Sequence, residues 1–476
     1  MPEPRPFHPV SYLDANAARR PDAPAVFDAG REVSFAELAG SVHALAERFR
    51  STGLTEGEPV GVRLPNRWEY VALELAVPAA GGVIMPLPLT LGEAELRWAM
   101  ERSGATRLIG EADLPDLFTP SKPPPAGPAP TPSLPTPPDR IVEIALSSGT
   151  TGMPKLASLS AGLKQATFVG FTGRLEVTEA DRVLVMSPLT QGIGGMCLFC
   201  LRLGAALIML HEPRFTPATV LRLATEHRAT MLVGVPTNVI RLLDSPLLER
   251  AELSNARVTA VAGAPMPPDV AAAWEDRTGS RVCIFYGSMD AGQLSVGSPS
   301  DPREKRHQTV GRPHDCCEVM ITGEGEICMR GDTVQERYWG EAAGPYSDDG
   351  WVHMGDLGQL DEDGYLQVLG RKKDLIIRGG TNINPHEVEQ ALRRHPAIAD
   401  ACVVGRPDRE LGERAVAFLV AQDPRMPPDL ELVKTFLAGE GMARYKWPEE
   451  VRAIAEIPLS GPGKVDRRTL QGLLLT

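Results

Sequence analysis

The sequence contains no apolar stretch long enough to cross a membrane. Its most apolar segment, MCLFCLRLGAALIML at residues 196–210, is interrupted by Arg202 and is shorter than the roughly 18 residues that a spanning helix needs. The first ten residues, MPEPRPFHPV, contain no apolar signal core. We therefore expect a protein with no membrane partner and a cytoplasmic location.

A basic excess and a disulfide framework are also missing. The formal net charge is −12, whereas nucleic-acid binders usually carry a basic footprint, so no nucleic-acid partner is expected. The seven cysteines are odd in number and scattered, which favours reduced thiols. Cys197 and Cys200 form one C-x-x-C without a second pair, which indicates core packing rather than a metal site. His314 and His353 have no partner at metal-ligand spacing and are interpreted as structural.

Glycine and proline are abundant, with 46 and 44 residues, and they indicate many short elements joined by turns. Apolar spacing predicts a helix over 34–53, capped by Ser34, and then a strand, a helix and a strand over 59–65, 68–82 and 83–88. This alternation predicts a mostly parallel sheet. Ligands bind at the carboxyl ends of strands in such sheets. Five more buried strands with turn residues behind them are expected over 182–188, 205–210, 229–236, 256–265 and 280–287.

The character of the chain changes after about residue 316, where short β segments alternate with Gly and Asp-Gly turns. A helix is expected over 384–396, a strand pair over 400–408 and 413–421, and a helix over 429–442. Together these predict a small α+β domain. Residues 120–138 are so rich in proline that we expect an extended surface loop there.

The most unusual short segment is SSGTTGMPK, from Ser147 to Lys155. Its spacing is G-x-x-G-x-x-K, with Pro154 before the lysine, so it is not a Walker loop. Glycines that admit a close polyanion, hydroxyls that donate hydrogen bonds and one lysine still favour phosphate binding. A flexible Ser/Gly turn is the alternative.

Further stretches follow in a fixed order: GAP at 263–265, FYGSMDAG at 285–292, GWVHMGDLGQLDEDGYL at 350–366, GRKKDLIIRGGTNINPHEVE at 370–389 and PLSGPGKVDRRTL at 458–470. Taken one by one, these residues have plain alternatives. Tyr286 could belong to the core, Asp356 could cap a turn, and Lys464 could be a solvated surface lysine.

In this order and spacing, the set resembles the adenylate-forming superfamily, which includes acyl- and aryl-CoA ligases, peptide-synthetase adenylation domains and firefly luciferase. The resemblance covers nearly the whole chain. It implies an α/β fold: a large N-terminal domain of parallel and mixed sheets with flanking helices, residues 1–370, and a small mobile α+β C-terminal domain, residues 371–476. It also implies ATP, Mg²⁺ and coenzyme A as cofactors and a small carboxylic acid as substrate.

The resemblance assigns a role to each motif. Lys464 would stabilise the charge that develops as the acyl-adenylate forms. Lys373 would be the hinge, and the loop with Gly379 and Gly380 would meet the thiol. ATP would be bound by Ser147, Ser148, Gly149, Thr150, Thr151, Gly152, Lys155, Gly263, Ala264, Pro265, Tyr286, Gly287, Ser288, Asp356 and Arg371.

Two departures from the family pattern stand out. Met289 and Asp290 replace the usual threonine and glutamate, so Asp290 is the only acid at the metal position and its carboxylate has a shorter reach. The acid-pocket segment carries Gln191 where a histidine or aromatic is usual, followed by Gly192, Gly194 and Gly195. We expect Gln191, Gly192 and Gly195 to line the pocket; the glycines could open space for a broad acid or only let the backbone turn.

The best interpretation is an ATP-dependent acid–thiol ligase. Its substrate is expected to be an aryl or other carboxylic acid without an amino group, because no aspartate is placed to bind an α-ammonium group. Coenzyme A is the expected thiol, since RGGTNINP at 378–385 resembles the CoA-ligase form of that loop. One alternative is a stand-alone adenylating enzyme that loads a carrier protein. Another is a degenerate nucleotide-binding protein, which Met289 and Asp290 motivate.

Overall fold

The computed structural model describes residues 10–119, 136–147, 155–211, 215–289, 291–379, 381–460 and 464–474, and for residues 147, 460 and 464 it describes the backbone alone. The proline-rich prediction therefore falls almost wholly outside the described residues. The chain divides into two compact units. The first comprises Met1–Val319 and Met329–Val352, and the second comprises Met320–Cys328 and His353–Thr476.

The first unit contains two mixed sheets within its described residues. The larger has nine strands in the order β14-β13-β12-β11-β10-β8-β9-β1-β2, and the smaller has five, β5-β3-β4-β6-β7. The strands are β1 Pro24–Asp28, β2 Arg31–Ser34, β3 Pro59–Val62, β4 Val83–Pro86, β5 Arg107–Ile109, β6 Ile141–Ser147, β7 Lys155–Ser160, β8 Arg182–Val185, β9 Ala206–Met209, β10 Met231–Gly234, β11 Val258–Val261, β12 Arg281–Ser288, β13 Gly292–Val296 and β14 Arg312–Pro313.

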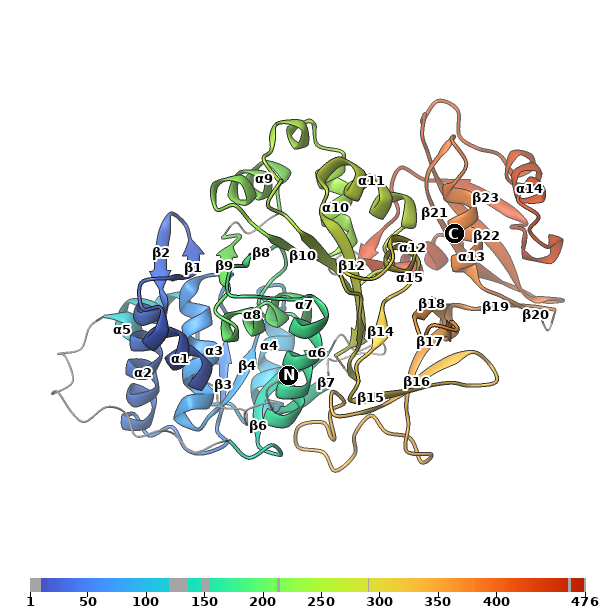
Figure 1. Cartoon of the computed structure of the whole chain (residues 1–476). Coiled ribbons are helices and arrows are strands. Elements are labelled where there is room, and N and C mark those ends of the chain that lie inside the picture. The colour runs from blue at the N-terminus through green and yellow to red at the C-terminus, as the bar shows by residue number, and fades with distance from the viewer. Residues whose placement is uncertain are drawn as a thin grey trace. The chain divides into compact units, whose positions relative to one another are not determined.

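Helices flank these sheets, as Figure 1 shows for α9, α10 and α11 beside the larger one. The helices of this unit are α1 Ser11–Arg19, α2 Phe35–Ser51, α3 Trp68–Ala80, α4 Glu93–Ser103, α5 Leu114–Phe118, α6 Ala161–Arg174, α7 Gly192–Met196, α8 Leu198–Arg202, α9 Pro217–Glu226, α10 Pro236–Leu243, α11 Pro268–Thr278 and α12 Arg303–Gln308. The five strands expected between residues 182 and 287 are confirmed as β8 to β12, and their mutual pairings are parallel.

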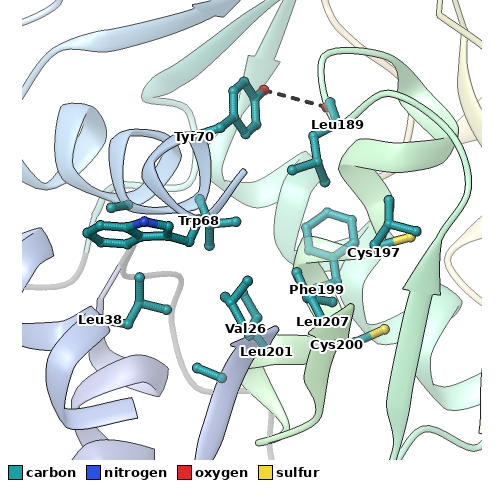
Figure 2. Close-up of a cluster of buried hydrophobic side chains, with 14 of the residues drawn as sticks. Val26, Leu38, Trp68, Tyr70, Leu189, Cys197, Phe199, Cys200, Leu201 and Leu207 are labelled. Atoms are coloured by element: carbon teal, nitrogen blue, oxygen red, sulfur yellow. Dashed lines mark hydrogen bonds between the residues drawn. The ribbon is translucent and has the colours of Figure 1, made fainter. Parts of the chain in front are cut away.

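The central strands are buried on both faces. Val183 and Val185 of β8 pack into one apolar cluster, whereas Leu184 packs into the other, together with Trp274 of α11. This explains why these strands read as continuous apolar runs rather than alternating ones. The first cluster also joins the N-terminal helices to the sheet, and Figure 2 shows Trp68 above Val26 in the same cluster.

Two local predictions can be checked directly in this unit. The helix expected at 34–53 is α2, and its cap is Ser34, whose Oγ accepts a hydrogen bond from Glu37 N at 3.1 Å. Cys197 and Cys200 are both fully buried in the first cluster, as expected for core packing (Figure 2). Burial raises the pKa of Cys200 to about 12, so its thiol stays protonated.

The second unit is the α+β region predicted after residue 371, extended by earlier strands. β17 (Val352–Leu360) pairs antiparallel with β18 (Leu366–Arg371). A separate sheet has the order β20-β19-β22-β21, and β23 pairs with β22. Its elements are β19 Ile376–Arg378, β20 Thr381–Ile383, α13 Pro385–Arg393, β21 Ile398–Asp408, β22 Gly412–Ala421, α14 Leu430–Gly439, β23 Glu450–Ala453, β24 Leu459–Ser460, β25 Lys464–Val465 and α15 Arg467–Gly472. β15 (Cys317–Ile321) and β16 (Glu326–Gly331) run through the points where the chain passes between units. A domain boundary at residue 370 stays a prediction.

Candidate functional site

The predicted phosphate segment joins two paired strands. β6 and β7 are antiparallel, and Ser147 is the register partner of Lys155. Residues 148–154, which include Ser148, Gly149, Thr150, Thr151 and Gly152, lie outside the described residues, as does the side chain of Ser147.

Lys155 has an aromatic partner that sequence reasoning missed. Its Nζ donates a hydrogen bond to Tyr338 Oη at 3.2 Å and lies 4.6 Å from the centre of the same ring. A cation over the face of a tyrosine is stabilised by the ring quadrupole. Tyr338 itself is 7% exposed, so its ring is a fixed, buried surface against which the Lys155 side chain lies.

The carboxyl ends of β11 and β12 carry the residues predicted for adenine. Gly263 has φ +87°, a conformation that L side chains rarely adopt, and it begins the Gly263–Pro265 turn. Tyr286 is half-buried in β12 rather than enclosed in the core. Gly287 is required by close packing, because a Cβ there would lie 2.4 Å from the carbonyl oxygen of Gly292 in the next strand.

The turn after β12 holds the two departures from the family pattern. Ser288 Oγ accepts a hydrogen bond from Ala291 N at 3.0 Å, so this hydroxyl caps its own turn. Met289 points toward α7: a Cβ built on Gly192 would lie 3.0 Å from Met289 Sδ. Asp290 lies outside the described residues.

The predicted pocket segment forms α7, with Gln191 at its N-cap position. Its three glycines are small for different structural reasons. A Cβ on Gly194 would lie 2.1 Å from the carbonyl oxygen of Pro188, and a Cβ on Gly195 would lie 3.2 Å from the carbonyl oxygen of Leu189. The absence of a side chain at both positions therefore lets the preceding backbone approach closely. Gly192 faces a side chain instead.

The backbone just before α7 is held from the β3–α3 connection. Asn66 Nδ2 donates to Ser187 O at 2.9 Å, and Asn66 Oδ1 accepts from Leu189 N at 2.7 Å. Tyr70 Oη lies 3.5 Å from Leu189 O (Figure 2). All four residues are buried, so these hydrogen bonds fix the backbone that leads into the pocket segment.

Behind Tyr70 lies a buried ionic cluster. Tyr70 Oη also contacts Glu74 Oε2 at 3.3 Å, and Lys164 Nζ contacts Glu74 Oε1 at 3.2 Å and the carboxylate of Glu143. Burial, together with the nearby Glu143 charge, raises the pKa of Glu74 to about 7 despite the opposing effect of Lys164. Burial opposes the charge of Lys164, but the two carboxylates raise its pKa.

In the second unit, the predicted ribose residues form a cross-strand pair. Asp356 lies within β17, not in a turn, and is the register partner of Arg371 in β18. Asp356 Oδ1 is 3.0 Å from Arg371 Nε. The aspartate is 5% exposed, whereas the arginine side chain is 44% exposed. The arginine therefore holds one carboxylate oxygen in place.

The predicted hinge lies between two anchored neighbours. Lys372 Nζ pairs with Glu324 and Glu326, at 2.8 and 3.0 Å, and Asp374 pairs with Arg467 at 3.2 Å. Lys373 is exposed, and its side chain makes no hydrogen bond or ion pair with any described residue. The two glutamates precede the hinge and Arg467 follows it, so the anchors belong to opposite sides of Lys373 in the sequence.

The remaining predicted residues are only partly described. Gly379 has φ +56°, and its N–H donates to Leu411 O at 2.7 Å, which fixes the start of the predicted thiol loop. Gly380 lies outside the described residues. The backbone of Lys464 pairs with Ser460 in the β24–β25 hairpin.

Neither a cluster of metal-ligating side chains nor a membrane-spanning helix is found among the described residues. No group of three or more His, Cys, Asp or Glu side chains there is arranged to hold a metal ion. No helix of this part of the chain has the length and apolar character required to span a lipid bilayer. His314 is 3% exposed, and its Nε2 lies 3.0 Å from Gln293 Oε1. Burial lowers the pKa of His314 to about 4, so it is a neutral core histidine.

Comparison with known proteins defines the class of this protein. The family model of the AMP-binding enzyme matches residues 13–339, and that of the AMP-binding enzyme C-terminal domain matches residues 387–464. The chain belongs to the AMP-binding enzyme family, which confirms the predicted adenylate-forming superfamily.

Individual relatives match over almost their full length. The sulfoacetate–CoA ligase of Cupriavidus necator is 32% identical over 507 residues, covering 98% of each chain. The feruloyl-CoA synthase of an Amycolatopsis species is 33% identical over 482 residues, covering 96% of each chain. Among solved structures, ATP-bound MatB from Rhodopseudomonas palustris has a TM-score of 0.84 at 26% identity, covering 97% of this chain and 98% of that one. The predicted α/β fold is thereby confirmed.

Proposed function

We propose that this protein is an ATP-dependent, AMP-forming acid–CoA ligase. A carboxylate oxygen of the acid attacks the α-phosphorus of ATP, and pyrophosphate leaves, which yields an acyl-adenylate. The thiol of coenzyme A then attacks the acyl carbon, and AMP leaves as the thioester forms. The observation that carries this proposal is the full-length similarity to CoA ligases, with both family regions in the expected order.

The nucleotide would be bound by residues at strand ends and in loops. The Ser147–Lys155 segment would take the β- and γ-phosphates, with the Lys155 ammonium supported by Tyr338. The Gly263–Pro265 backbone and the half-buried Tyr286 ring would contact adenine. Asp356, oriented by Arg371, would accept hydrogen bonds from the ribose hydroxyls.

Magnesium would enter with the nucleotide as MgATP. Mg²⁺ in nucleotide sites usually keeps several water molecules and is bound by substrate phosphates together with one or two carboxylates. Asp290 is the protein carboxylate expected to meet this ion, through a water molecule or directly. The Mg²⁺ would neutralise charge on the departing pyrophosphate.

Two lysines of the C-terminal region would have separate roles: Lys464 in adenylation, and Lys373 as the hinge between the two steps. Lys464 would stabilise the developing negative charge during adenylation. The domain beginning at residue 371 would then move about Lys373 and remove Lys464, so that the loop at Gly379 and Gly380 meets the thiol. Support for a hinge at Lys373 comes from its neighbours: Lys372 and Asp374 are ion-paired, whereas the Lys373 side chain forms no ion pair with any residue that the structure describes.

The acid would bind beside Gln191, Gly192 and Gly195, and we propose a non-amino carboxylic acid. The protein would act in the cytoplasm, since all seven cysteines are free thiols.

The experiment is a thiol-dependence assay. Purified protein is incubated with MgATP, a panel of carboxylic acids and either coenzyme A or a phosphopantetheinylated carrier protein, and thioester products are identified by mass. We expect AMP and an acyl-CoA in equal amounts. Acylation of the carrier protein without acyl-CoA would instead favour the carrier-loading function.

A further inference from the structure

The short helix α7 is packed against residues from three other segments. A Cβ on Gly192 would lie 3.0 Å from Met289 Sδ, and a Cβ on Gly263 would lie 3.0 Å from Ile193 Cδ1. At its other end, Met196 Sδ accepts a hydrogen bond from Gln293 Nε2 at 3.6 Å. The outside groups at these contacts are the Met289 thioether, the Gly263 backbone and the Gln293 amide, while Ile193 and Met196 are apolar side chains of α7 itself.

Met289 cannot perform the task of the hydroxyl that the family usually has at this position. A thioether has no hydrogen to donate and is only a weak acceptor, so it offers a phosphate oxygen nothing. It is instead a soft, polarisable group that fills irregular apolar space. Its sulfur lies directly over the one glycine of the pocket segment that faces a side chain rather than backbone.

We propose that Met289 is a specificity-determining residue, and that its thioether and the bare Cα of Gly192 form one wall of the acid pocket. The inference rests on the proposed function, because it takes the Gln191–Gly195 segment as the acid site. None of residues 191–196 has a charged side chain. A charged or hydroxyl-rich group placed against the thioether and the bare Cα would lose hydration, and neither of them offers a hydrogen-bond donor in return. The part of the acid that lies against this wall is therefore alkyl or aryl.

The contact also explains why residue 192 is glycine. A side chain at 192 meets the Met289 sulfur, which would have to shift by a few tenths of an ångström, so we expect the two residues to form a coupled pair. Their effects on catalysis are then non-additive, as expected for residues in direct contact.

The test is a double-mutant cycle of Met289→Thr and Gly192→Ala, with kcat/KM measured for hexanoate, phenylacetate and succinate and KM measured for ATP. We expect the wild type to prefer the two apolar acids. Met289→Thr should lower that preference over succinate by about tenfold, the effect of removing an apolar contact. It should not raise the KM for ATP, because the substitution restores the hydroxyl that the family usually has at this position. Gly192→Ala should be costly alone and nearly harmless in the Met289→Thr background.

Matched controls come from exposed positions. Gly173→Ala in α6 adds a Cβ with no atom within 4 Å, and Met426, 74% exposed, provides the control Met426→Thr. Both should leave the acid preference unchanged. Thermal midpoints of all variants are measured in parallel, so that loss of folding is recognised.

Three results would overturn the inference. An equal loss for all acids with a raised KM for ATP would assign Met289 to the nucleotide. Additive effects of the two substitutions, in activity and in thermal midpoint, would show that the contact is not formed. A wild type that forms no AMP with any acid would overturn the proposed function itself, and the specificity role with it.

Discussion

Asp356 Oδ1 and Arg371 Nε lie 3.0 Å apart, on residues directly opposite each other in β17 and β18. The pair is asymmetric, because Asp356 is buried and the Arg371 side chain is 44% exposed. An arginine that holds one carboxylate oxygen orients the group in advance of its ligand, which lowers the entropic cost of binding.

Asp356→Asn should therefore weaken nucleotide binding more than catalysis. The substitution removes the charge that strengthens hydrogen bonds from the ribose, worth about 1.5–3 kcal/mol, so the KM for ATP should rise about 10- to 100-fold. Steady-state kinetics with ATP as the varied substrate measure this. Asp363→Asn, in the exposed turn between the same strands, is the matched control, and an unchanged KM in Asp356→Asn would exclude the ribose role.

Asn66→Ala should loosen the backbone that enters the pocket segment. Its loss leaves the buried Ser187 carbonyl and Leu189 N–H without their partner, at a cost of about 2–4 kcal/mol in the free energy of unfolding. Urea unfolding measures this cost. We also expect the KM for the acid to rise more than the KM for ATP. Asn255→Ala, at a partly exposed position, serves as control; equal changes in both KM values would reduce Asn66 to a purely structural residue.

Glu74→Gln should change how stability depends on pH. The folded pKa of Glu74 is about 7, above the ordinary value of 4.5, so the folded state binds more protons than the unfolded state between these values. The contribution of Glu74 to the free energy of unfolding therefore falls as the pH rises through this window and levels off above it. Glutamine carries no charge, so the variant avoids this loss. Its stability relative to the wild type should increase by about 1–3 kcal/mol between about pH 5 and pH 8.

Denaturant unfolding across this pH range, with Glu431→Gln as a control whose side chain is 82% exposed in the wild type, measures the difference. A difference that does not change with pH would show that Glu74 titrates normally and that Lys164 compensates its burial fully.

Lys464→Ala should separate the two half-reactions. Loss of a cation that stabilises the adenylation transition state is worth about 3–4 kcal/mol, or a 10²- to 10³-fold slower adenylation. Thioester formation from supplied acyl-adenylate should be spared. Single-turnover measurements of each step, with Lys434→Ala as the surface control, decide the matter. Equal losses in both steps would remove Lys464 from its proposed role.

The local elements were predictable because their causes are local. Ser34 indicates the start of α2 through its capping hydroxyl. The apolar runs from 182 to 287 indicate β8 to β12, because strands covered on both faces need apolar residues throughout. The order of glycine, hydroxyl and acidic motifs identified the superfamily, since each motif has a chemical task that few other residues can fill.

The contacts that support the site were not predictable from spacing. Lys155 and Tyr338 are 183 residues apart, and Asn66 and Ser187 are 121 apart, so only the packing of complete sheets brings them together. The glycines of α7 illustrate the same limit. Their sequence looks uniform, yet Gly194 admits a backbone carbonyl and Gly192 admits the Met289 side chain.

The central claim is that the chain activates a carboxylic acid as an adenylate. Its most direct test is the exchange of labelled pyrophosphate into ATP, measured with and without acids from a broad panel, in the presence of Mg²⁺ and without coenzyme A. We expect exchange that depends on both Mg²⁺ and at least one acid. Nucleotide binding without acid-dependent exchange, across the whole panel, would contradict it and would identify a degenerate nucleotide-binding protein.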